Sequence, residues 1–292
     1  MAKTISCPLH RNGLNPLRLH MPSSRHDVRR ILATAQPPFE TIAAARNEDS
    51  FRAQQLMKLG SVSEIALAEL LDQANLKKEH LLTCASSFHM RQGRIRLSGE
   101  VMRLVVEAHE SGEEVVAFTC VPEMWSVPEL SWGECNNRRY KAQFRRWLER
   151  ARVAQASGFI YSGFHGEWNG KRYQHHIHGI AVGEKAIKLR GLYGRFGLVK
   201  TDDIRAPLQI VDVPITEDLT DLAKWITYCL QSWWPYRALF VNAEGKVFRS
   251  RHRQRLPEAQ HLEFLNFMAR HGMGDLLFLN GIKLAKDRLI RI

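Results

Sequence analysis

The dipeptide Asn169-Gly170 lies between two runs of strand-forming residues and constrains the fold more than any other feature. Asn-Gly favours the positive φ angles of a two-residue turn, so the pattern predicts a β-hairpin. In a hairpin closed by this dipeptide, His165 faces Gln174 across the two strands. Because side chains alternate between the faces of a sheet, one face of the hairpin then carries a polar set. That set is His165, Glu167, Gln174, His176 and His178.

These side chains are candidate metal ligands. His176 and His178 lie one residue apart on the same face and can reach one divalent ion. The His-x-His spacing is not diagnostic by itself in a chain that contains 13 histidines. The third ligand is open between Glu167, His165 and Gln174, and we favour Glu167 because a carboxylate supplies the charge that Mg²⁺ or Mn²⁺ prefers. A set made of histidines alone would suit zinc.

The segments around the hairpin predict an α+β protein. The apolar run 115–121 is typical of a strand, and residues 137–152 form an amphipathic helical pattern. After the hairpin, the sequence predicts a strand in 207–215, a helix in 216–234 and a strand in 237–248 that leads into the turn Glu244-Gly245. With one insertion, this order fits a ferredoxin-like βαββαβ core with an antiparallel sheet.

The remaining segments extend this core on both sides. Residues 1–48 are basic and lack periodicity, which indicates an irregular N-terminal arm. Residues 49–111 predict a helical subdomain, in which Ser61 and Glu64 have the spacing of a helix capping box. Residues 112–245 hold the α+β core, and residues 246–292 form a basic C-terminal extension without a predicted role.

The charge of the chain indicates a polyanionic partner. Lys and Arg number 42 against 30 Asp and Glu, a formal charge of +12. Such an excess attracts phosphate backbones whatever their base sequence. Part of this positive charge is concentrated in the predicted helix 137–152, which contains seven Lys and Arg residues and a single acidic residue, Glu149. We expect nucleic acid to bind Arg138, Arg139, Lys141, Arg145, Arg146 and Trp147, with Trp233 and Trp234 as further stacking candidates.

Other features narrow the class of protein. No segment approaches the roughly 20 apolar residues of a membrane-spanning helix, so a membrane protein is not expected. The five cysteines include no CxxC pair, which indicates reduced thiols and a cytoplasmic protein.

Tyr228 is a candidate nucleophile on the predicted helix 216–234. Lys224 and Gln231 lie on the same helical face, one turn before and one turn after it. A tyrosine in this setting is most often a packing residue, and its phenol, with an ordinary pKa of about 10, attacks only with help. A metal-polarised phosphate and a nearby cation would provide that help.

Three segments in this order resemble the motifs of the HUH endonuclease superfamily, close to the single-tyrosine initiators of rolling-circle replication. The run VVAFTCV (115–121) resembles the first strand motif. QHHIHGIAV resembles the His-hydrophobic-His motif, with His176, Ile177 and His178 in its three places. TYCLQ resembles the tyrosine motif, with Tyr228 in the nucleophile place. The resemblance covers residues 112–245 and implies that they form an HUH-type nickase domain.

The resemblance implies a chemistry. His176, His178 and a third polar residue would hold Mg²⁺ or Mn²⁺ on the scissile phosphate, and Tyr228 would attack to give a 5′-phosphotyrosine and a free 3′-OH. The implied partners are single-stranded DNA at a replication origin and the host replication machinery. The chain departs from the family at Gln231, where a Lys is usual, and at Lys224, where some initiators carry a Glu. Lys224 is therefore the candidate for the missing charge.

Two other interpretations remain open from the sequence. A conjugative relaxase or a single-tyrosine transposase would use the same chemistry in another setting. A non-catalytic DNA- or RNA-binding protein would carry the same charge with a structural histidine cluster. If Tyr228 is not the nucleophile, Tyr236 is the next candidate. The sequence does not indicate an oligomeric state.

Overall fold

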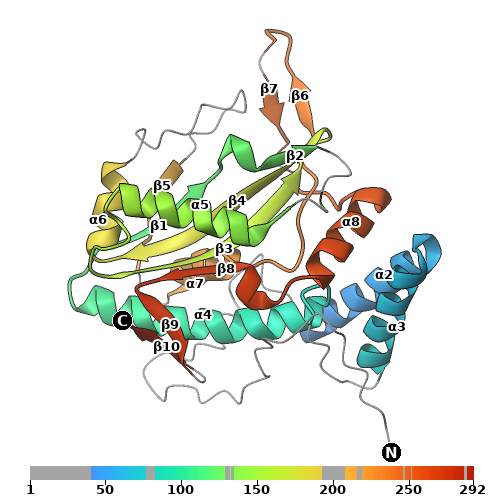
Figure 1. The fold of residues 1–292 in the computed structure, drawn as a ribbon, viewed down its shortest axis with the longest axis horizontal. Coiled ribbons are helices and arrows are strands. Elements are labelled where there is room, and N and C mark those ends of the chain that lie inside the picture. Colours follow the sequence, from blue (N-terminus) through green and yellow to red (C-terminus); the bar gives the residue numbers. More distant parts are fainter. Residues whose placement is uncertain are drawn as a thin grey trace, which may run out of the picture.

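The computed structural model describes residues 41–76, 83–128, 132, 135–192, 208–215, 219–245, 247–250, 252–285 and 288–292. The first forty residues of the predicted N-terminal arm lie outside this part of the chain. Figure 1 shows an antiparallel sheet with helices on both faces, which confirms the predicted α+β class. None of the helices in the described residues is long and apolar enough to cross a membrane.

The central sheet has the strand order β5-β1-β4-β3-β8, and a short strand β2 pairs with β4. Every pairing in it is antiparallel. The strands are β1 (Val115–Cys120), β2 (Ser126–Pro128), β3 (Phe159–Trp168), β4 (Arg172–Val182), β5 (Leu208–Asp212) and β8 (Leu277–Asn280).

The two faces of the sheet bury separate apolar clusters. Helices α5 (Asn137–Arg150) and α6 (Glu184–Gly191) cover one face, where Phe144 of α5 packs with Phe118 of β1. Helices α4 (Ser87–Glu110) and α7 (Thr220–Tyr228) cover the other face (Figure 1). Alternate residues of each strand therefore face different helices, which places any one polar set on one side only.

The chain enters the sheet in the order β1-α5-β3-β4-α6-β5. The sequence interpretation of the last elements was wrong, because β5 completes this order and residues 237–248 do not add a strand to the sheet. They contribute to a separate hairpin of β6 (Leu239–Val241) and β7 (Val247–Arg249). Helix α6 was not predicted, because its 8 residues are fewer than the roughly 11 to 18 over which a helical pattern of apolar residues is recognised.

The predicted helical region is present at the N-terminal side. It consists of α2 (Ile42–Leu59), α3 (Val62–Leu76) and α4. Helix α2 begins earlier than predicted, after the capping residue Thr41, and the backbone N–H of Ser61 donates to Glu64 as the capping box requires. Gly112 follows α4 with a φ of 78°, a conformation that ends helices.

The C-terminal segment belongs to the fold. It contains α8 (Glu258–Ala269), the strand β8 at the edge of the sheet, and a hairpin of β9 (Ile282–Ala285) and β10 (Arg288–Arg291). Short 3₁₀ turns lie at Glu123–Trp125 and Met273–Asp275. Arg103 of α4 donates to the carbonyl oxygen of Leu289 at 2.8 Å, which fastens the last hairpin to that helix.

The β3–β4 hairpin forms with a shifted register. Asn169 donates its backbone N–H to the carbonyl oxygen of Arg172 at 3.2 Å, so Gly170 and Lys171 are the turn residues. Gly170 has a φ of 95° and supplies the required conformation. His165 therefore pairs with His176 and not with Gln174. The shift moves each partner by two residues, so the predicted pairs were wrong while the predicted face is confirmed.

The end of α7 lies directly against β3 at Gly163. A Cβ atom at this position would collide with the backbone carbonyl of Cys229, the residue after Tyr228. Because backbone atoms cannot move aside as a flexible side chain can, a glycine is needed for this approach.

We predict that Gly163→Ala lowers the free energy of unfolding by about 1–3 kcal/mol, the usual cost of overpacking. Urea denaturation would measure it. The matched control is Gly191→Ala, since nothing lies within 4 Å of a Cβ atom there. Equal stabilities of the two variants would contradict the close approach of α7 to β3.

Candidate active site

Three buried histidines form a cluster on the sheet face that α7 covers. His165 comes from β3, and His176 and His178 come from β4. Their side chains are 2%, 5% and 7% exposed, and one ring nitrogen of each lies within 4.8 Å of those of the other two. The cluster could therefore hold a metal ion.

Hydrogen bonds orient the imidazoles of His176 and His178. Nδ1 of His176 lies 3.0 Å from the carbonyl oxygen of Gln174, and Nδ1 of His178 lies 2.8 Å from the hydroxyl of Thr119. A carbonyl oxygen only accepts, so Nδ1 of His176 carries the proton and Nε2 is left to bind a metal. Thr119 is in place because it pairs with His178 in the β1–β4 register. Such outer contacts are typical of metal-binding histidines.

His165 carries the clearest sign of an unmet interaction. Its Nε2 is buried and has no hydrogen-bond partner among the described residues. Burial lowers the pKa of His165 well below its ordinary value, and the neighbouring His176 adds to this effect, so the ring is neutral at pH 7. A neutral imidazole with a buried lone pair fits a metal ligand, because a buried polar atom without a partner is otherwise costly.

The structure places Glu167 outside the cluster, which corrects our preference for it as the third ligand. Its carboxylate forms a buried ion pair with Arg249, and Arg237 lies 3.8 Å away. Gln174 is also engaged, since its amide donates to the carbonyl oxygen of Pro122 at 3.0 Å. The third member of the group that could hold a metal ion is His165. The sequence offered no signal against Glu167, because Arg249 lies more than eighty residues further along the chain.

Tyr228 lies against the histidine cluster. It is the last residue of α7, and its ring centroid is 4.4 Å from that of His178 and 5.6 Å from that of His165. Tyr228 is only partly buried. The structure therefore brings together the tyrosine and two of the histidines that the sequence singled out.

Arg253 contacts the hydroxyl of this tyrosine and was missed from the sequence. Its guanidinium donates to Tyr228 Oη at 2.8 Å and lies 5.0 Å from the ring centroid. Lys224, the predicted source of positive charge, forms an exposed ion pair with Asp221 at 2.9 Å. Gln231 lies beyond the end of α7 and is buried. Arg253 belongs to the basic C-terminal segment, where no motif distinguishes it from its neighbours.

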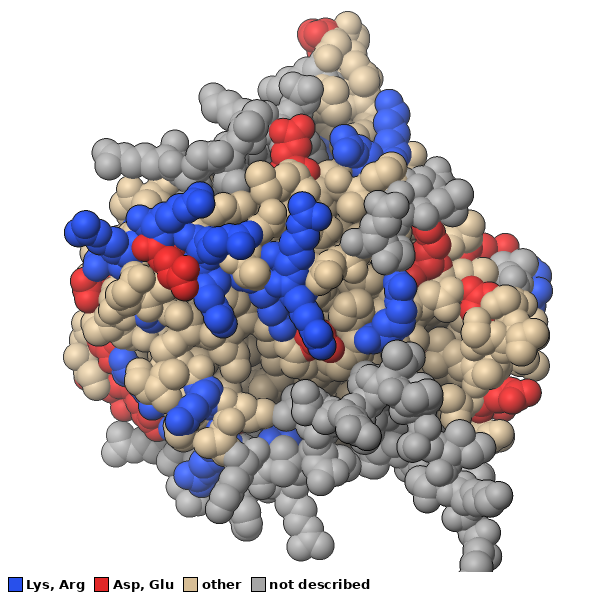
Figure 2. All heavy atoms as spheres, viewed as in Figure 1, with Lys and Arg blue, Asp and Glu red and all other residues tan. Residues whose placement is uncertain are grey.

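The predicted nucleic-acid residues of α5 lie on the other face of the sheet. Figure 2 shows Lys and Arg gathered over the face of the molecule on which α5 lies in Figure 1. Trp147 packs on Trp125, with ring centroids 5.6 Å apart. Of the predicted set, Arg138, Arg139, Arg145 and Arg146 are exposed, and Lys141 and Trp147 are partly buried. This basic surface is therefore separated from Tyr228 by the sheet.

The chain matches no protein-family model, no curated protein and no solved structure. Fold and site together define it as an α+β protein with a buried three-histidine cluster beside a tyrosine.

We predict that His165→Ala lowers the affinity for Mn²⁺ by more than the roughly 10- to 100-fold that loss of an outer contact costs. Isothermal titration calorimetry would measure it. The matched comparison is Glu167→Gln, which leaves Mn²⁺ affinity near that of the wild type. It also lowers the melting temperature, because breaking a buried ion pair costs about 3–5 kcal/mol. The reverse pattern would restore Glu167 as the ligand.

Proposed function

We propose that this protein is a metal-dependent endonuclease of the HUH superfamily that nicks single-stranded DNA at a specific site and initiates rolling-circle replication. The observation that carries the proposal is the packing of Tyr228 against the cluster of His165, His176 and His178. A structural histidine cluster has no need of a partly exposed tyrosine whose hydroxyl is held by an arginine.

The order of elements supports the family. The path β1-α5-β3-β4-α6-β5, with the sheet order β5-β1-β4-β3, corresponds to the ferredoxin-like plan that the resemblance implies. The first motif forms β1 and contributes Thr119, and the His-hydrophobic-His motif forms β4. The tyrosine motif spans the end of α7.

The histidine cluster would hold the metal that the reaction needs. A bound Mg²⁺ or Mn²⁺ would withdraw charge from the scissile phosphate and so expose phosphorus to attack. A set of three imidazoles argues against Mg²⁺, which prefers oxygen ligands. It suits Zn²⁺ and also admits Mn²⁺ if phosphate oxygens of the strand complete the coordination. His176 and His178 are held by their outer contacts, and His165 completes the set.

Tyr228 performs the displacement. Its Oη forms a bond to phosphorus while the bond from phosphorus to the 3′ oxygen breaks, and the phenol proton leaves to solvent. The released 3′ oxygen takes a proton from water and becomes the 3′-OH that a polymerase extends. The 5′ end remains attached to Tyr228 as a phosphodiester, which conserves the energy for later strand transfer.

Arg253 supplies the charge that the family usually obtains from a lysine near the tyrosine. It already donates a hydrogen bond to Tyr228 Oη, and this bond strengthens as the oxygen gains negative charge. Lys224 is assigned no role, because its charge is paired with Asp221.

We predict that wild-type protein with Mn²⁺ forms a covalent adduct with members of a random single-stranded DNA library, and that Tyr228→Phe forms none. The variant lacks the attacking oxygen but keeps the ring that packs on His178. Denaturing electrophoresis of labelled DNA would measure adduct formation. Tyr236→Phe is the matched control and should react like the wild type.

Two outcomes would redirect the assignment. An adduct that persists in Tyr228→Phe and disappears in Tyr236→Phe would move the nucleophile to Tyr236. No adduct with any single-stranded DNA and any divalent metal would favour a non-catalytic binding protein.

We predict that Arg253→Gln slows adduct formation about 10²- to 10³-fold at saturating DNA, the usual cost of one donor to a charged oxygen in an active site. Arg253→Lys should recover part of the rate, because it keeps a cation near Oη. Single-turnover kinetics would measure both. Arg288→Gln, an exposed arginine of β10, is the control. A comparable loss in Lys224→Gln and none in Arg253→Gln would return the role to Lys224.

A further inference from the structure

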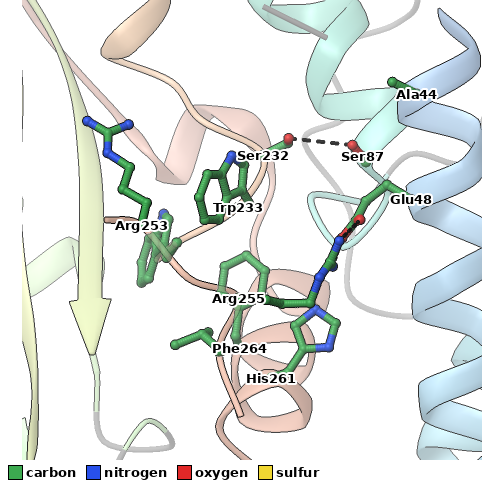
Figure 3. A pocket seen from close by; sticks show the side chains of 11 residues that line it. Ala44, Glu48, Ser87, Ser232, Trp233, Arg253, Arg255, His261 and Phe264 are labelled. Atoms are coloured by element: carbon green, nitrogen blue, oxygen red, sulfur yellow. Dashed lines mark hydrogen bonds and ion pairs between the residues drawn. The ribbon is translucent and has the colours of Figure 1, made fainter. Parts of the chain in front are cut away.

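A pocket of about 340 Å³ lies beside the nucleophile. It opens where the chain after Tyr228 passes the edge of β3, a passage fixed by the hydrogen bond from Trp168 N–H to the carbonyl oxygen of Pro235 at 3.0 Å. Figure 3 shows side chains from α2, the start of α4, the segment after α7 and α8 directed around this space. Its size suits one small planar group, at the lower end of ligand pockets in proteins.

Arg253 lies between the pocket and the hydroxyl of Tyr228. It lines the pocket and also donates to Tyr228 Oη at 2.8 Å. A strand whose phosphate lies at Tyr228 therefore has an adjacent nucleotide at the entrance of the pocket.

Two of the three charged residues that line the pocket, Glu48 and Arg255, neutralise each other, and the third is Arg253. Arg255 donates two hydrogen bonds of 2.8 Å to the carboxylate of Glu48. Burial alone would raise the pKa of Glu48, but Arg255 and Arg52 outweigh it and lower that pKa to about 2. Burial lowers the pKa of His261 to about 4, so this ring is neutral at pH 7. Away from Arg253, which lies at the side of Tyr228, the interior therefore suits an uncharged group better than a phosphate.

Aromatic rings form much of the remaining wall. Trp233 is partly exposed in the pocket, and behind it Trp234 and Phe264 are buried with ring centroids 5.5 Å apart. The hydroxyls of Ser87 and Ser232, 3.4 Å apart, add polar atoms at one side. A planar ring with polar edges matches this combination, and a nucleobase is such a ring.

We propose that this pocket receives one base of the single strand, next to the phosphate that Tyr228 attacks, with Trp233 as its stacking surface. The inference rests on the proposed function for its position in the reaction. The binding itself is independent of nicking. The pocket then selects the nucleotide beside the nick, while Arg253 separates the base from the reacting phosphate.

The test compares strands that differ only in their bases. Fluorescence anisotropy would measure the affinity of the full chain for labelled dT20 and dA20 and for a 20-mer of abasic sites with the same backbone charge. We expect Trp233→Ala to reduce the preference for the base-containing strands by about 5- to 150-fold, the worth of one stacked base. Trp233→Phe should keep most of the preference, and the salt dependence should not change, because no phosphate contact is removed.

Phe240→Ala is the matched control, since Phe240 is an exposed aromatic residue of β6, away from the pocket. It should behave as the wild type. Circular dichroism would verify that each variant is folded, and quenching of tryptophan fluorescence by dT20 but not by the abasic strand, lost in Trp233→Phe, gives a second measurement.

The inference is overturned if the wild type does not distinguish base-containing from abasic strands, or if Trp233→Ala keeps the full preference. The results that would contradict the base-binding pocket differ from those that would contradict the nickase activity. A Trp233-dependent base preference without any adduct would leave the pocket standing and remove the nickase. Adduct formation without such a preference would do the opposite.

Discussion

The antiparallel pairing of β3 with β4 is the constraint on which the site depends. It sets His165 opposite His176 and Gly163 opposite His178. The first pair creates the histidine cluster, and the second leaves room beside His178, because Gly163 admits the backbone of Cys229. Tyr228 precedes Cys229, so the same glycine brings the tyrosine ring to the cluster. A shift of β4 by one residue against β3 would turn His176 and His178 to the α5 face and separate them from His165.

The buried polar groups around the cluster fall into two kinds. Glu167 and Gln174 share the face of the histidines, but Arg249 and the Pro122 carbonyl occupy their polar atoms. Nε2 of His165 is different, since no described residue offers it a hydrogen bond. Burying a polar atom without a partner costs about 1–3 kcal/mol. An ion bound by the cluster would give this atom a partner.

Local signals predicted much of the fold and the centre of the site. The strand 115–121, the Arg-rich helix and the hairpin are each specified by residues close together in the chain, and parity alone placed the five polar side chains on one face. One failure was local, and the other two depend on distant partners. The exact register follows from the Asn169–Arg172 turn, the exclusion of Glu167 from Arg249, and the contact with Tyr228 from Arg253. Arg249 and Arg253 both lie in segments without a periodic pattern. Their positions are set by tertiary packing, which cannot be inferred from neighbouring residues in the sequence.

The exposed positive charges of α5 and the paired charges around Tyr228 lie on opposite faces of the sheet. Near Tyr228, Glu167 neutralises Arg249, Asp221 pairs with Lys224, and Glu48 pairs with Arg255. Paired cations release few counterions and add little to nucleic-acid affinity. The exposed arginines of α5 lie on the opposite face and face little acid, so in the proposed function they contribute the salt-dependent affinity. In the same proposal, Arg253 and a metal ion would act on one phosphate, at a place where general attraction is weak. A site arranged in this way distinguishes phosphates by position, because affinity from α5 cannot compensate for a misplaced strand at Tyr228.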